Sequence, residues 1–185
     1  DTFITDDTLD FIEDLTFGSD GNLYLSSLSR EQSRNKVARY DGKTGAFIDN
    51  FVAPGSGGIS GPVGIDFGED KNLYVGNVFD GEILRYDGKT GAFIDTFITG
   101  NQGDRFADFT FAEDGNLYIA NPGQDSVSRY DSTTGEFIDN FVESNSGGLD
   151  RPVEAVFGFD RHLYINSFET DSILRYNRNT GDFLD

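Results

Sequence analysis

One eleven-residue stretch occurs four times in this chain, and its spacing constrains the fold more than any other feature. The clearest copy begins at Arg85 and reads Arg-Tyr-Asp-Gly-Lys-Thr-Gly-Ala-Phe-Ile-Asp. The arginines that open the four copies, Arg39, Arg85, Arg129 and Arg175, lie 46, 44 and 46 residues apart. A period in this range is typical of stacked units that bury their apolar faces against one another.

Each repeat contains short segments suited to β-strands. Phe93 and Phe97 alternate with Ile94 and Ile98, which is the period of two expected of a strand covered on both faces. Glycine is frequent and helical periodicity is absent, so we expect almost no helix. The strands expected in the second repeat, with equivalents in the other three, are residues 62–67, 72–76, 83–87 and 92–98.

Four short strands joined by turns form an antiparallel meander, and one such meander cannot bury two apolar faces alone. Meanders stacked around an axis form a β-propeller, and units of this length favour blades over a flat solenoid. We therefore predict one all-β propeller domain over 1–185, with four four-stranded antiparallel blades of about 46 residues. The repeats expected are 6–52, 53–98, 99–142 and 143–185.

The first five residues match the second half of a strand that the C-terminus begins. Residues 1–5 correspond to 95–99, and 183–185 correspond to 93–95. We predict that residues 1–5 complete the last blade as a strand beside 173–176, because a blade without most of its outer strand exposes unpaired backbone groups. The pairing could form within one chain, or between chains as an eight-bladed dimer or a head-to-tail filament.

The residues of the second repeat resemble the NHL-type repeat. The motif is Pro62-x-Gly64-Ile65-x-Phe67, then Asn72-Leu73-Tyr74, a polar loop and Ile83-Leu84-Arg85-Tyr86, with Asp-Gly before the Asn in the first and third copies. It is similar to the propellers of streptogramin lyase and of the regucalcin-like gluconolactonases. The resemblance covers essentially the whole chain and implies blade structure. The lyases use His in their sites, whereas His162 stands alone in a turn where the other copies have Asn, so lyase activity is not expected.

Aromatic side chains are expected to supply much of the core. The chain has 18 Phe and 8 Tyr but no Trp, Met or Cys, and each ring can bury roughly 150–250 Å². We expect the arginine of each Arg-Tyr pair to pair with an acid of a neighbouring strand or blade. The rings predicted to be buried between blades are Phe47, Phe93 and Phe137, together with Tyr24, Tyr74, Tyr118 and Tyr164 in large part.

The net charge of −19 argues against nucleic acid as a partner, because phosphates need a basic surface. The acids are spread along the chain, which favours a self-repelling, soluble surface over a dedicated cation-binding one. No apolar run is long enough for a membrane span. The acidic surface and the absence of Met and Cys suggest a secreted or extracellular protein.

Two sets of polar positions are candidate sites. Three residues before the phenylalanine of the first strand, three copies carry an acid where the second carries Gly64; acids there could hold Ca²⁺ or Mg²⁺ at the mouth of a central channel, or could line a hydrated channel. Three residues after the tyrosine of the second strand, polar side chains could line a ligand face or cap strand ends and turns. The acids are Asp14, Asp108 and Glu154, and the polar residues are Ser27, Asn77, Asn121 and Ser167.

These features favour a non-enzymatic binding or assembly module. Its partner would be another protein or a second copy, joined head to tail through the split outer strand. The alternative is a metal-dependent hydrolase or lactonase that acts at the acidic channel mouth, as the resemblance to gluconolactonases implies.

Overall fold

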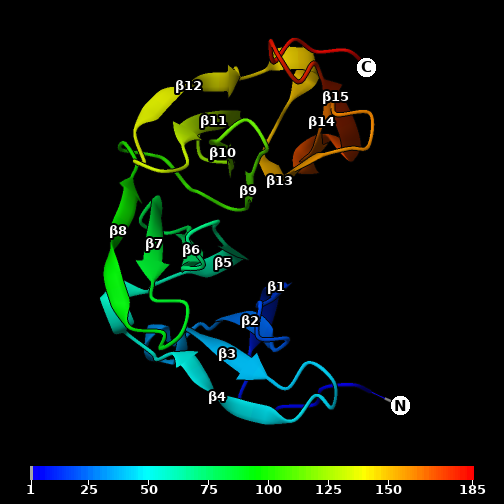
Figure 1. Ribbon diagram of the computed structural model, residues 1–185. Helices are drawn as coiled ribbons and strands as arrows, with labels where there is room; N and C mark the ends of the chain where they lie inside the picture. Colours follow the sequence, from blue (N-terminus) through cyan, green and yellow to red (C-terminus); the bar gives the residue numbers. More distant parts are fainter. Residues whose placement is uncertain (1) are drawn as a thin grey trace. The chain divides into compact units, whose positions relative to one another are not determined.

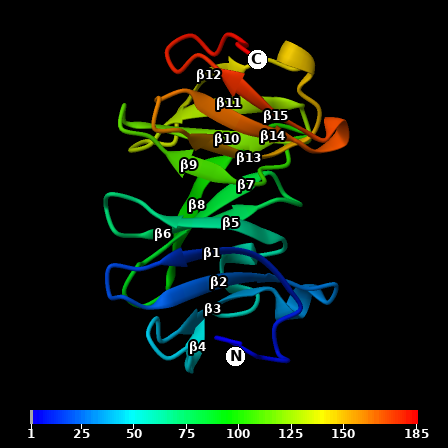
Figure 2. The ribbon, with the colours of Figure 1, turned by 90° about the vertical axis from the view of Figure 1, so that its right-hand side faces the viewer.

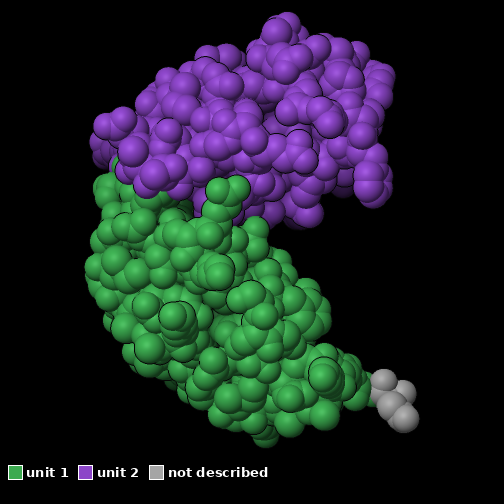
Figure 3. All heavy atoms as spheres, in the orientation of Figure 1, with its two compact units in different colours: residues 1–99 green, residues 100–185 purple. Residues whose placement is uncertain are grey.

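The computed structural model describes residues 2–185, which contain β-strands and short 3-10 turns (Figure 1). No α-helix is found within these residues, as predicted. The chain divides into two compact units, residues 1–99 and 100–185 (Figure 3), which are described separately below. Their boundary lies one residue from the predicted junction of the second and third repeats, which was placed between residues 98 and 99.

The first unit contains two four-stranded antiparallel sheets, each in sequence order (Figure 2). These sheets are blade 1 and blade 2. Their strands are β1 (Phe11–Phe17), β2 (Leu23–Leu28), β3 (Lys36–Tyr40) and β4 (Phe47–Val52), then β5 (Pro62–Phe67), β6 (Leu73–Asn77), β7 (Glu82–Tyr86) and β8 (Phe93–Thr99). The 3-10 turns η1 (Gln32–Arg34) and η2 (Ser56–Gly58) lie in the connections. The predicted strands of the second repeat are thus confirmed to within one residue at either end.

The second unit contains blades 3 and 4, which repeat the same plan. Blade 3 has β9 (Phe109–Phe111), β10 (Asn116–Asn121), β11 (Ser126–Asp131) and β12 (Phe137–Val142). Blade 4 has β13 (Pro152–Phe157), β14 (Leu163–Ser167) and β15 (Ser172–Tyr176), with turns η3 (Ser146–Gly148) and η4 (Phe168–Thr170). In place of a fourth strand, the described part of blade 4 has a single antiparallel bridge between Tyr176 and Phe183.

The recurring eleven-residue stretch forms a hairpin between the third and fourth strands of a blade. Arg85 lies opposite Asp95 across this hairpin, and its Nη2 lies 2.6 Å from the Asp95 Oδ2. The corresponding distances are 2.6 Å for Arg39–Asp49, 2.5 Å for Arg129–Asp139 and 2.5 Å for Arg175–Asp185. The predicted pairing of these arginines with acids of the neighbouring strand is confirmed.

The turn of this hairpin is held by its first aspartate. The Oδ1 of Asp87 accepts hydrogen bonds from the backbone N–H groups of Lys89 and Thr90 and from the Thr90 hydroxyl, at 3.1, 2.9 and 2.8 Å. These bonds lower the pKa of Asp87, and the Thr90 hydroxyl is the largest cause. The contacts are those of a hairpin turn.

Burial of the tyrosines follows the prediction, but burial of three phenylalanines does not. Tyr24, Tyr74 and Tyr118 are buried and Tyr164 is half-buried. The prediction for Phe47, Phe93 and Phe137 was wrong, because they are 51%, 40% and 54% exposed. Each begins the outermost strand, where its ring meets the edge of a tyrosine of its own blade rather than another blade. The buried rings of β4 and β12 come four residues later, at Phe51 and Phe141.

Residues 2–5 form no strand in this single chain, and Asp1 lies outside the described residues. Ile4 instead packs with Leu9 against a buried cluster of blade 1 that includes Leu25 and Tyr40. The pairing of residues 1–5 with 173–176 between two chains stays a prediction.

Candidate functional site

The four polar residues predicted for a ligand face use their side chains in the same way. Each lies near or at the end of the second strand of its blade, is buried, and accepts a backbone N–H from the loop before the first strand of that blade. The donors are Asp10 to Ser27 (3.3 Å), Ser60 and Gly61 to Asn77 (both 2.8 Å), Arg105 to Asn121 (3.0 Å), and Asp150 to Ser167 (2.9 Å). In these contacts the side chains hold the preceding loop in place by accepting its backbone N–H groups. A shared ligand-facing role stays a prediction.

The three acids predicted for a cation site have different surroundings. The carboxylate of Asp14 accepts the N–H of Leu15 at 2.6 Å and, from blade 2, the N–H of Ile65 at 2.8 Å, so it ties β1 to β5. Asp108 is half-buried beside β9, and Glu154 is exposed on β13. Within residues 2–185, no group of three or more acidic or histidine side chains is arranged to hold a metal ion. Convergence of these three acids on one cation stays a prediction.

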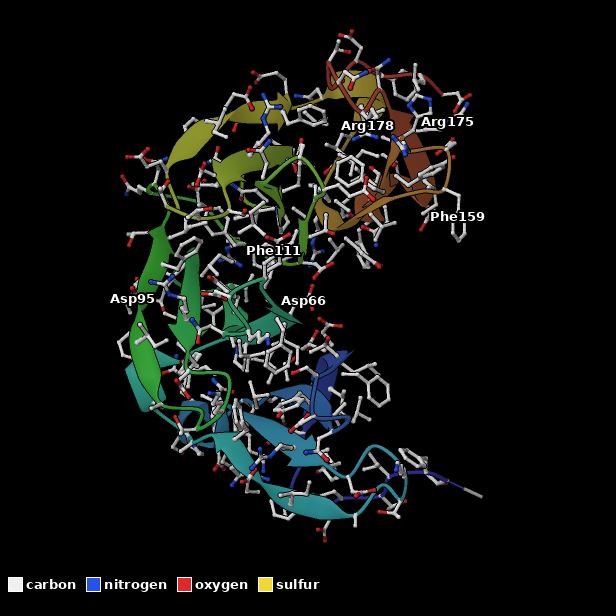
Figure 4. The ribbon with its side chains drawn as sticks, in the orientation of Figure 1. Asp66, Asp95, Phe111, Phe159, Arg175 and Arg178 are labelled. Carbon is white, nitrogen blue, oxygen red and sulfur yellow. The ribbon has the colours of Figure 1, made fainter. Side chains whose placement is uncertain are left out.

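A carboxylate that the sequence did not single out lies next to Asp14. Asp66 on β5 accepts hydrogen bonds from the Thr16 hydroxyl of β1, at 3.3 Å, and from the N–H of Phe67, at 2.8 Å (Figure 4). Burial raises the pKa of Asp66, and the negative charge of Asp14 adds to this effect. The position of Asp66 is held by Thr16 and Thr110 in the neighbouring repeats. This replacement of threonine by aspartate was the sequence feature that could have pointed to Asp66.

The blades within each unit are joined by an interlock of rings. Tyr24 of blade 1 packs edge-on against Phe67 of blade 2, with centroids 5.0 Å apart and planes at 77°. Tyr118 of blade 3 meets Phe157 of blade 4 in the same way, at 5.0 Å and 78°. A tyrosine of the second strand therefore meets a phenylalanine of the next blade's first strand. Such pairs add about 0.5–1.5 kcal/mol beyond the area that they bury.

Blade 1 has the phenylalanine of this ring pair and blade 4 has the tyrosine, but neither ring has the other member of the pair beside it within residues 2–185. Phe17 of blade 1 corresponds to Phe67 and is 58% exposed. Tyr164 of blade 4 corresponds to Tyr24 and is half-buried. Neither ring contacts another aromatic ring within residues 2–185. Blade 1 and blade 4 thus present two surfaces of the kind that are joined inside each unit.

The third strand of blade 4 shows the same incompleteness. In blades 1, 2 and 3, the second residue of this strand lies opposite an aliphatic residue of the fourth strand and is fully buried. The pairs are Val37–Val52, Ile83–Ile98 and Val127–Val142. Ile173 holds this position in blade 4, where it is 64% exposed because no strand within residues 2–185 covers it.

The N-terminal segment already occupies the place of such a strand relative to blade 1. The carbonyl oxygen of Phe51 lies against Gly91 of blade 2, and the carbonyl oxygen of Phe141 lies against Gly181 of blade 4. The approach is so close that a Cβ added to either glycine would lie 1.8 Å from the oxygen. The carbonyl oxygen of Phe3 lies against Gly45 in the same manner, and a Cβ added to Gly45 would lie 2.2 Å from it. These glycines also have φ near +70°, which L side chains rarely adopt. Phe3 therefore corresponds to Phe51 and Phe141, the ends of outer strands that pack on the next blade.

Comparison with solved structures defines the class of fold. The chain is similar to virginiamycin B lyase from Staphylococcus aureus, with TM-score 0.70 and 18% identity over 92% of this chain and 53% of that one. It is similar to the calcium-binding protein regucalcin from Agrobacterium tumefaciens, with TM-score 0.63 and 23% identity over 82% of this chain and 51% of that one. An extracellular domain of a one-component system from B. thetaiotaomicron matches with TM-score 0.70 and 14% identity, over 100% of this chain and 22% of that one.

These likenesses confirm the β-propeller class, and they include both kinds of propeller that the repeats resemble. At these identities they concern the fold alone. The chain spans about half the length of the lyase and regucalcin structures. No protein-family model and no curated protein sequence matches the chain. No helix of the described residues is long and apolar enough to cross a membrane.

Proposed function

We propose that this protein is a binding and assembly module whose blades associate head to tail with those of a second copy. Exposure of Ile173 carries the proposal. Its three counterparts are fully buried beneath a fourth strand, whereas Ile173 is 64% exposed. An uncovered strand edge with an apolar face is a template for an added strand.

The segment that would cover Ile173 is residues 1–5 of the second copy. Ile4 corresponds to Ile98, which lies opposite Ile83 in blade 2. Phe3 and Ile4 already pack on blade 1, as Phe51 and Val52 pack in the core shared with blade 2. Pairing of this segment with β15 of another copy would also bring the unpartnered Phe17 against Tyr164. One contact would thereby complete both the strand ladder and the ring interlock.

One further observation supports a pair of copies. The chain is about half as long as the lyase and regucalcin structures that it matches, so two copies approach the length of one of them. The contact is heterologous, so it closes into a ring of two copies or propagates as a filament. An extracellular location, as in the B. thetaiotaomicron neighbour, belongs to the same proposal.

Disulfide trapping tests the proposed contact directly, because the chain has no cysteine of its own. Ile4→Cys and Ile173→Cys are made as two separate proteins and mixed under mild oxidation. Residues paired across strands lie close enough for a disulfide, with Cα atoms usually about 4.4–6.8 Å apart. We expect a cross-linked dimer containing one copy of each variant. The matched control replaces Ile4→Cys by Thr8→Cys, which lies outside the proposed strand.

If the contact is head to tail, a disulfide between Ile4→Cys and Ile173→Cys should form more readily than a disulfide between two copies of the same variant. Equal yields with the Thr8→Cys control would contradict the proposal. So would a monomeric mass in sedimentation at all concentrations, or an Ile4→Cys, Ile173→Cys double variant that cross-links within one chain alone. Deletion of residues 1–5 should abolish association while the tyrosine-rich core of each unit stays folded.

A further inference from the structure

Blade 3 contains a polar cavity of about 340 Å³ that lies apart from the strand edges discussed above. It is lined by residues of β11 and β12, by the last residue of β10, and by loop residues at 101, 104, 124 and 143–144. The lining residues that matter here are Asp104, Asn121, Ser126, Ser128, Tyr130 and Asn140. All of them belong to the second unit.

At one core position that lines the cavity, blade 3 carries a polar residue where the other blades carry an apolar one. The third strand carries Ala38, Leu84 and Leu174 at this position in blades 1, 2 and 4, and all three are buried. Blade 3 carries Ser128, which is equally buried and whose hydroxyl donates to the Asn140 Oδ1 at 3.3 Å. Relative to the leucines of blades 2 and 4, serine removes volume and adds a polar group, and relative to Ala38 it adds the hydroxyl alone.

Tyr130, two residues after Ser128, also differs from the equivalent tyrosines of the other blades, in the hydrogen bonding of its hydroxyl. The hydroxyl of Tyr86 donates to the Ser56 carbonyl at 2.9 Å, that of Tyr176 to the Ser146 carbonyl at 2.7 Å, and that of Tyr40 to an aspartate at 2.6 Å. The Tyr130 hydroxyl has no such partner within residues 2–185. Burial is the main cause that raises the pKa of Tyr130, so the group is a neutral hydroxyl with a hydrogen to donate.

A second polar group in the cavity wall is also unsatisfied. The Oγ of Ser126 is buried and has no hydrogen-bond partner within the described residues, although the side chain lines the cavity. Buried polar groups in native proteins are almost always paired, and leaving one unpaired is costly. Ser126 Oγ is one such group, and the accessible Tyr130 hydroxyl lines the same cavity, so both are open to hydrogen bonds from a polar guest.

The rest of the wall is preformed. Asn121 donates to the Asp104 Oδ1 at 2.7 Å and accepts the N–H of Arg105 at 3.0 Å, while Asp104 also accepts the N–H of Asn101 at 2.6 Å. The Asp104 carboxylate therefore already accepts two hydrogen bonds, and a second acid, the exposed Glu143, also lines the cavity. Both carboxylates can accept further hydrogen bonds from hydroxyl groups. Phe137 lies beside Tyr130, with ring centroids 5.3 Å apart, and presents an exposed ring at the cavity.

We propose that this cavity binds a neutral sugar of about one hexopyranose ring. Hydroxyl and amide groups in the wall can each donate or accept, as sugar hydroxyls require, and the aromatic side chains offer apolar surface to the ring carbons. The volume lies within the range of small-molecule sites, about 300–1,000 Å³. The guest would accept from the Tyr130 hydroxyl and bond the Ser126 Oγ.

Saturation-transfer NMR on the full chain tests this proposal with methyl glycosides of glucose, galactose and N-acetylglucosamine as probes. At about 10 mM probe, a site with a Kd near ~1 mM is mostly occupied. We expect transfer to at least one glycoside. Ser128→Leu restores the residue of blades 2 and 4 and should abolish transfer while leaving the melting temperature equal or higher. Ser33→Leu makes the same exchange at an exposed site and should bind as the wild type does.

Tyr130→Phe gives an independent test that does not fill the cavity. It should weaken glycoside binding several-fold without lowering the melting temperature, since no bond within the protein is lost. Tyr86→Phe removes the paired counterpart and should lower the melting temperature with binding unchanged. Absence of transfer from all three glycosides would overturn the proposal, and so would equal transfer in the wild type and a folded Ser128→Leu variant.

Discussion

Replacement of Ile173 by alanine should weaken association of the protein without weakening the fold of a single chain. Complete burial of an isoleucine side chain contributes about 1.5–3 kcal/mol. Ile173 is 64% exposed, so covering it in a dimer should contribute roughly 1–2 kcal/mol. Ile173→Ala should therefore raise the dimer dissociation constant by about 5- to 30-fold. Sedimentation equilibrium over a range of concentrations measures this change.

The matched control is Ile83→Ala, which makes the same exchange at the same strand position of blade 2. Ile83 is fully buried, so its truncation should cost about 2–5 kcal/mol of folding free energy. Urea titration at concentrations where the protein is monomeric should show this loss for Ile83→Ala and almost none for Ile173→Ala. An equal loss for both variants would mean that Ile173 is buried within the chain. An unchanged dissociation constant would mean that the contact lies elsewhere.

Three other measurements probe the blades. Tyr86→Phe should lose roughly 0.5–1.5 kcal/mol in urea titration because it breaks the bond to the Ser56 carbonyl, whereas Tyr130→Phe should not. Burial raises the pKa of Asp66, so the folded state holds that proton more tightly and stability falls as the pH rises through the raised pKa. Asp66→Asn should thus be more stable than the wild type at neutral pH, and a less stable variant would contradict this sign. Ca²⁺ should raise the melting temperature if the three predicted acids share a cation, and an unchanged melting temperature at saturating Ca²⁺ would count against that site.

Features set by short spacing were predictable from the sequence. The Arg85–Asp95 pair and the Asp87 turn lie within one eleven-residue stretch, so strand geometry alone brings their atoms together. The alternation of Phe93 and Ile94 likewise predicted a strand. It did not predict that Phe93 lies at the outer rim, because a period of two assigns side chains to a face but does not say how much of that face the next blade covers.

The candidate sites depended on longer-range contacts. Asn77 was a plausible ligand residue by position, yet its side chain accepts two backbone N–H groups from a loop sixteen and seventeen residues away along the chain. Asp14 was a plausible cation ligand, yet its carboxylate bonds the Ile65 N–H, 51 residues away. Loop backbone groups must find partners when they are buried, and nothing in the spacing of the acids or amides specifies which ones they meet.

The sequence by itself determined the repeat, the strands, the hairpin turns and the propeller class, because each follows from the period of a pattern or from the chemistry of a turn. It also determined that the two ends of the chain match each other. Only the tertiary structure decided which blades are complete: Ile173 is exposed where Ile83 is buried, and Ser128 lines a cavity where Leu84 is part of the core. The strands that contain Ile83 and Ile173 acquire different roles because burial of this isoleucine depends on whether a fourth strand pairs beside it, which the residues of a single strand do not encode.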